Sequence, residues 1–142
     1  MDSYHISLQI ADAQSRLSAA RSKLSSLRKD RDDLDELSQK HESTRSSVTS
    51  DIESRVRRLD SATIDEKKVR SFASYKTVMR EKLAGGGRIT SALDDTTIRI
   101  NRAIDDIDWE ITIASRNCDC IEDEISSLRT SYNNAKLLEA AS

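Results

Sequence analysis

This 142-residue sequence contains no proline, and only 4% of its residues are aromatic. Hydrophobic residues make up 36% and charged residues 34%, which is little apolar material for a globular core. Long helices with narrow apolar stripes between solvated faces fit this composition better. The regular spacing of the apolar residues argues against disorder. We therefore predict an all-α protein with a single helical domain over residues 1–142.

The formal net charge is only -2, so the composition indicates neither a nucleic-acid partner nor an anionic membrane surface. Cysteine is also scarce, since Cys118 and Cys120 are the only two. Two residues apart on a helix, they point about 200° apart, which is poor geometry for a disulfide. A single C-x-C without histidine partners is a weak metal signal. We predict packed or surface thiols, no metal and no cofactor.

The opening residues, "MDSYHISLQIADAQSRL", lack the basic start and the continuous apolar stretch of a signal peptide. No stretch of the sequence is apolar enough to be a transmembrane segment. We expect a cytoplasmic protein without membrane insertion. Any export would use a route that needs no cleaved signal peptide.

A heptad seam predicts a first long helix over about residues 3–60. Its first half is apolar, with candidate packing residues Leu17, Leu24 and Leu27, whereas its middle carries polar residues such as His41 and Arg45. These polar positions have two interpretations. Either they specify register and partner, or the helix there projects past its partner into water, with a bend at "SQKHESTRSS".

A second seam predicts a long helix over about residues 91–138, on the order of 70 Å in length. Its apolar positions alternate spacings of four and three, and this periodicity outranks the strand preference of isoleucine. A helix with a single apolar stripe must lay it against another helix. We therefore predict an elongated antiparallel hairpin of the two long helices, with packing residues on the second that include Ile104, Ile107, Ile111, Ile121 and Ile125.

A shorter middle helix is predicted over about residues 64–84. Thr63 and Glu66 have the spacing of a capping box, in which the two side chains satisfy each other's backbone N–H groups. One face of this helix is apolar and includes Phe72, Tyr75 or Lys76, and Met79.

All three glycines follow this helix, as Gly85, Gly86 and Gly87. Neither the lysine–serine/threonine pair of a phosphate loop nor the spaced glycines of a dinucleotide site accompany them. Adjacent glycines after a helix suit a cap with positive φ and then a turn. We predict that this glycine turn redirects the chain between the middle and last helices.

No constellation of residues predicts catalysis. Asp105, Asp106, Asp108 and Glu110 straddle the seam position Ile107 and fan around the solvent side of the helix, whereas a catalytic pair converges in a pocket. The two histidines lie far apart in the sequence, without matched acidic or cysteine partners. We therefore expect no enzymatic activity.

Trp109, the only tryptophan, lies on the side of its helix opposite the isoleucine seam, with Ile113 one turn further on. An outward-facing pair of this kind needs a cover. Either the middle helix covers it, through Phe72, Tyr75 or Met79, or a partner protein does. We take these five residues as the candidate partner-binding set.

Three stretches resemble the YwqH-like small helical proteins encoded beside LXG-domain toxins of bacterial type VII secretion systems, which are relatives of WXG-type helical hairpins. They are "LSAARSKLSSLRKDRDDLDEL", "VRSFASYKTV" before a loop, and "INRAIDDIDWEITIASRNCDCIEDEISSL". Together with the three-helix pattern, the resemblance covers most of the chain.

The resemblance implies a non-enzymatic targeting factor or chaperone. Such a protein binds the helical N-terminal domain of an LXG toxin and prepares it for export, either alone or together with a second small helical partner. It would stay in the cytoplasm or leave with the toxin. The heptads by themselves also fit an alternative, a self-assembling structural coiled coil.

Overall fold

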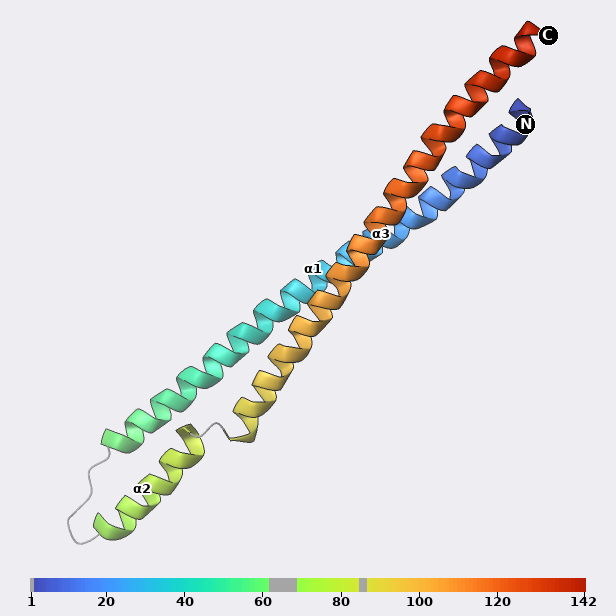
Figure 1. Cartoon of the computed structure of the whole chain (residues 1–142). Helices are drawn as coiled ribbons and strands as arrows, with labels where there is room; N and C mark the ends of the chain where they lie inside the picture. Colours follow the sequence, from blue (N-terminus) through green and yellow to red (C-terminus); the bar gives the residue numbers. More distant parts are fainter. Residues whose placement is uncertain (1, 62–68, 85–86) are drawn as a thin grey trace. The chain divides into compact units, whose positions relative to one another are not determined.

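The computed structural model describes residues 2–61, 69–84 and 87–142, and nearly all of them are helical. Helix α1 spans Ser3–Ser61, α2 spans Val69–Ala84 and α3 spans Arg88–Ala141 (Figure 1). The described ranges contain no strand. The all-α prediction is therefore confirmed, and α3 starts at Arg88 rather than at the predicted Ser91.

Both long helices start at a residue that satisfies free backbone N–H groups. Asp2 precedes α1, and its Oδ1 accepts a hydrogen bond from the backbone N–H of His5 at 2.9 Å, as an N-cap does. This backbone bond has the largest effect in lowering the pKa of Asp2, and the hydrogen bond with the His5 ring lowers it further. Before α3, the carbonyl of Gly87 accepts from the N–H groups of Thr90 and Ser91 at 3.0 and 3.3 Å.

Of the predicted glycine turn, Gly87 belongs to the described residues, whereas Gly85 and Gly86 lie outside them, as do Thr63 and Glu66 of the predicted capping box. Gly87 is a turn residue whose φ lies outside the left-handed range. A Cβ there would meet the Lys82 carbonyl oxygen at 3.6 Å, an ordinary contact. Gly87 therefore does not use positive φ, and its carbonyl oxygen accepts hydrogen bonds from the first turn of α3.

Contacts divide the chain into two compact units. The first consists of Met1–Asp33 and Ile104–Ser142, and the second of Leu34–Ala103. In the first unit, α1 and α3 run antiparallel, because Ser3 contacts Glu139 at one end and Arg31 contacts Asp108 at the other (Figure 1).

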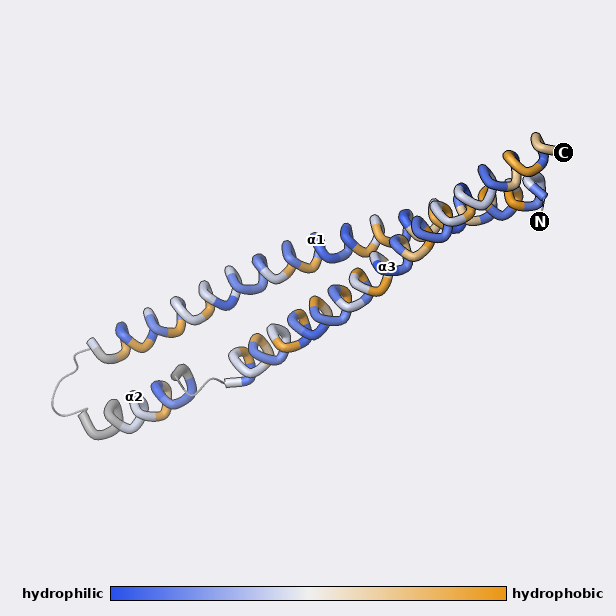
Figure 2. Tube along the Cα trace, turned by 45° about the horizontal axis from the view of Figure 1, so that its top comes forward, coloured by the Kyte–Doolittle hydropathy of each residue, from blue (hydrophilic) through white to orange (hydrophobic). Residues whose placement is uncertain are grey.

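The core of the first unit is a single seam between α1 and α3. Figure 2 shows that apolar residues recur along both helices between hydrophilic ones, as a narrow seam requires. Burying one such leucine or isoleucine contributes about 1.5–3 kcal/mol. Of the predicted packing residues, Leu27, Ile104 and Ile111 are half-buried, and the others are buried together with Ala13, Ala114 and Cys118: Leu17, Leu24, Ile107, Ile121 and Ile125.

In the second unit, polar residues take part in the contact between α1 and α3. The His41 Nε2 atom lies 2.8 Å from Thr97 Oγ1, and Arg45 Nη2 lies 2.7 Å from an Asp94 carboxylate oxygen. Helix α1 continues through this stretch without interruption. The alternative in which this part of α1 projects past its partner into water is therefore wrong at His41 and Arg45, because both find polar partners on α3.

Candidate protein-interaction surface

In the first unit, three arginines of α1 reach carboxylates of α3 beside the seam. They form the pairs Arg16–Glu124 at 2.7 Å, Arg21–Glu122 at 2.9 Å and Arg31–Asp108 at 2.7 Å. Exposed ion pairs of this kind contribute little stability, but their spacing favours one register of the two helices.

The contact with Arg16 changes the pKa of Glu124. The hydrogen bond from Arg16 is the largest cause of the lowered pKa, and the positive charge of Arg16 lowers it further. Asp108 is exposed, as predicted, and it also accepts the bond from Arg31 Nε, because it lies one position beyond Ile107 and flanks the seam.

The ends of α1 and α3 are joined through Ser3 and Glu139. The backbone N–H and the hydroxyl of Ser3 donate to the two Glu139 carboxylate oxygens at 2.9 and 2.8 Å. Ser3 is buried although it is polar. The backbone bond first, and then the hydroxyl bond, lowers the pKa of Glu139.

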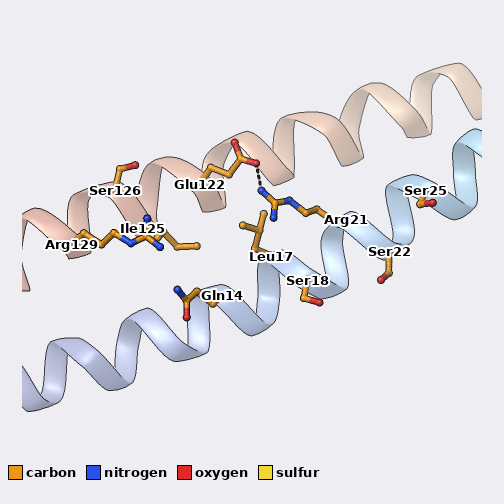
Figure 3. A pocket seen from close by; sticks show the side chains of 10 residues that line it. All are labelled: Gln14, Leu17, Ser18, Arg21, Ser22, Ser25, Glu122, Ile125, Ser126 and Arg129. Atoms are coloured by element: carbon orange, nitrogen blue, oxygen red, sulfur yellow. Dashed lines mark hydrogen bonds and ion pairs between the residues drawn. The ribbon is translucent and has the colours of Figure 1, made fainter.

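A groove of about 600 Å³ runs along one side of the seam, between α1 and α3 of the first unit (Figure 3). The buried side chains Leu17 and Ile125 contribute its apolar part. Small hydroxyl side chains line much of the remainder, and the Arg21–Glu122 pair crosses it, as Figure 3 shows. The serines are Ser18, Ser22, Ser25 and Ser126. Short side chains of this kind allow another backbone to approach closely.

Trp109 and Ile113 lie on α3 opposite its contact with α1. Trp109 is about 200° around the helix from the buried Ile107, and Ile113 follows Trp109 by one turn. Their exposed fractions are 61% and 48%. Within the first unit, the described residues therefore leave much of both side chains uncovered.

The other three candidate contact residues belong to α2 in the second unit. Tyr75 is 55% exposed and Met79 is half-buried, whereas the side chain of Phe72 lies outside the described part. Val78, which the sequence analysis did not single out, is 49% exposed. The candidate residues thus form two groups, Trp109 with Ile113 and Tyr75 with Met79, each in its own unit.

The second unit also holds a hollow of about 590 Å³ between α1 and the start of α3. Val48, Ile52 and Ile89 contribute apolar lining, and Arg55, Lys82 and Arg88 contribute positive charge. The sequence analysis missed this hollow, because residues far apart in the chain form it and their seam position alone gives no sign of a space between them.

The two cysteines are free thiols, Cys118 buried in the seam and Cys120 exposed, which confirms the prediction made for them. Within the described ranges, no group of three or more histidine, cysteine, aspartate or glutamate side chains is placed to hold a metal ion. None of the helices in these ranges has the length and apolar character needed to cross a membrane.

Comparison of the chain with protein-family models, with curated proteins and with solved structures finds no match.

Proposed function

We propose that this chain is a non-enzymatic protein-binding module built as an antiparallel hairpin of two long helices with a shorter middle helix. The observation that carries the proposal is the exposed pair on α3, Trp109 at 61% and Ile113 at 48%. A water-exposed tryptophan beside an exposed isoleucine gains free energy when another apolar surface covers both. Tryptophan is also among the residues most enriched at the centres of protein interfaces.

The partner we propose is the helical N-terminal domain of an LXG toxin, which the chain would bind in the cytoplasm and prepare for type VII secretion. The support for this identity is the resemblance of the three sequence stretches to YwqH-like proteins. The physical support is of a different kind. Two helices with one seam leave their flanks open, and adding helices to them buries more apolar surface.

The groove beside Leu17 and Ile125 offers such a flank. Its serine side chains are short, so a partner helix can approach α1 and α3 beside the Arg21–Glu122 pair that crosses the groove. The proposed complex therefore uses Trp109 and Ile113 as its main contact, with the groove accommodating a further helix of the toxin domain. Tyr75 and Met79 on α2 are the candidate contacts of the second unit.

Co-expression of the chain with the N-terminal domain of an LXG toxin from the same genome, followed by co-purification on a tag placed on the LXG domain, tests this proposal. We expect the two chains to elute together and the Trp109→Ala variant to be lost from the complex. Ser115→Ala is a matched control, because Ser115 is a half-buried residue of the same helix outside the candidate contacts. Failure of the wild-type chain to bind the LXG domain would overturn the proposal.

A further inference from the structure

Trp109 and Ile113 are the centre of a longer stripe on the outer face of α3. Asp106 lies three residues before Trp109, and Arg116 lies three residues after Ile113. Spacings of three, four and three keep all four side chains on one side of a helix. All four are exposed. We call Asp106, Trp109, Ile113 and Arg116 the outer stripe.

The outer stripe has the same spacing in both directions, with an acid at one end and a base at the other. When two copies of such a helix lie antiparallel, the two-fold axis passes at the level of Ile111. Trp109 of each copy then faces Ile113 of the other, and Asp106 of each faces Arg116 of the other. An isologous interface requires this self-complementarity.

We propose that a second copy of this chain occupies the outer stripe and forms an antiparallel, two-fold symmetric dimer through α3. The inference rests on the proposed function in one respect, since it takes the same surface as a helix-binding site. The inference goes beyond the proposed function because it names a second copy of the chain as the occupant of the outer stripe when the toxin domain is absent. The toxin domain would then have to displace the second copy.

The charges of the outer stripe support this occupant. Among the described residues, neither Asp106 nor Arg116 has an ion-pair partner, although three other arginines of the same unit pair across the seam. The two residues are ten positions apart, about 15 Å along the helix, so they cannot pair with each other within one copy. The antiparallel dimer gives each of them one partner on the other copy and so forms two Asp106–Arg116 pairs.

The same charges select the orientation. A parallel pairing in the same register would place Asp106 against Asp106 and Arg116 against Arg116, and like charges in an interface are unfavourable. The stripe is also short. It provides less than the roughly 800 Å² per partner of a standard interface, so we expect a weak and reversible dimer.

Sedimentation velocity of the purified full-length chain, from micromolar to submillimolar concentration, tests the inference. The wild-type chain should shift from monomer to dimer over this range. Asp106→Arg and Arg116→Asp each create two like-charge contacts, and each should raise the dimer dissociation constant about tenfold or more. The double variant exchanges the charges and should return the constant to near the wild-type value.

A mixture of the two single variants is a further test. The outer stripe of Asp106→Arg carries two arginines, and that of Arg116→Asp carries two aspartates. The mixture should form a heterodimer with a dissociation constant near the wild-type value, although each variant alone dimerises more weakly than the wild type. Asp33→Arg and Lys29→Glu are matched controls on α1, since both residues are exposed and outside the outer stripe. They should leave the dissociation constant within about threefold of wild type. Circular dichroism should show unchanged helix content for every variant.

A wild-type chain that stays monomeric over the range would overturn the inference, and so would single variants that dimerise normally or a double variant that does not recover. Co-purification with the LXG domain separates this failure from failure of the proposed function. If the chain is monomeric but binds the LXG domain, only the dimer proposal is rejected. If the chain forms a dimer with the expected charge dependence but does not bind the LXG domain, only the proposed toxin partner is rejected.

Discussion

Ser3 donates two hydrogen bonds to Glu139, a residue 136 positions away in the chain, and so joins the start of α1 to the end of α3. Helix ends fray when their backbone groups have no partner. Here the carboxylate satisfies the Ser3 N–H and hydroxyl together. The contact holds α1 and α3 in register at this end of the first unit.

The first prediction concerns the titration of Glu139. Its pKa lies below the ordinary value of 4.5, because the carboxylate form accepts the bonds from Ser3. The contact therefore stabilises the folded state above about pH 4.5, and this stabilisation is lost as the pH falls through the lowered pKa. An NMR titration of the Glu139 carboxyl carbon should give a midpoint below 4.5.

Ser3→Ala should move this midpoint upward, since the hydroxyl bond is lost and only the backbone bond remains. Ser7→Ala is the control, because the Ser7 hydroxyl donates to the Tyr4 carbonyl within α1 and does not reach Glu139. An equal effect of both substitutions would show that the Ser3 hydroxyl bond is absent in solution.

The second prediction compares two isoleucines of α3. Ile107 is 9% exposed in the seam, whereas Ile113 is 48% exposed on the outer stripe. Ile107→Asp places a charge in the seam and should lower the free energy of unfolding by about 3 kcal/mol or more. Ile113→Asp should lower it by less than about 1 kcal/mol. Urea unfolding followed by circular dichroism measures both, and similar losses would contradict the orientation of α3.

The third prediction concerns the polar contact of the second unit. The His41 Nε2 atom lies 2.8 Å from Thr97 Oγ1 and 3.0 Å from the Leu93 carbonyl oxygen, which can only accept. The Nε2–H group is therefore the donor. A double-mutant cycle with His41→Ala and Thr97→Ala should give a coupling free energy of about 0.5–1.5 kcal/mol.

Thr96 provides the control for this cycle. Its hydroxyl donates to the Ala92 carbonyl within α3, and the residue is exposed. His41→Ala combined with Thr96→Ala should therefore show additive effects. Coupling in the control cycle as strong as in the Thr97 cycle would mean that a general change in α3, and not the His41–Thr97 contact, is being measured.

The fourth prediction concerns Gly87. Because its φ lies outside the left-handed range and a Cβ would make only an ordinary contact at 3.6 Å with the Lys82 carbonyl oxygen, Gly87→Ala should be tolerated. We expect unchanged stability or a gain of up to about 1 kcal/mol, since alanine restricts the unfolded chain. A loss above about 1 kcal/mol in thermal unfolding would show that this position needs glycine.

The helices and the seam could be predicted from sequence because they depend on local periodicity. Leu17, Ile107 and Ile121 recur at heptad spacing, and the same spacing buries them against a neighbouring helix. The exposure of Trp109 followed from the same frame, because its position relative to Ile107 places it on the opposite face. The sequence of one helix is therefore enough to predict which of its residues lie on the buried face and which lie on the exposed face.

The contacts between distant segments could not be predicted in this way. The Ser3–Glu139 bonds and the His41–Thr97 contact depend on how far α1 is shifted along α3, and heptads permit several shifts that differ by one repeat. The role of Asp2 as an N-cap had a local signal, an acidic residue directly before the first turn, which the sequence analysis overlooked.

Isothermal titration of the purified LXG domain with wild-type chain and with Trp109→Ala tests the central claim most directly, when combined with the melting temperature of each chain alone. Because Trp109 is 61% exposed, its replacement should shift the melting temperature by no more than a few degrees. Because Trp109 is proposed as an interface anchor, the Trp109→Ala substitution should weaken binding by about 2 kcal/mol or more, roughly thirtyfold. A lowered melting temperature with unchanged affinity would contradict the account, since Trp109 would then serve the fold and not the partner.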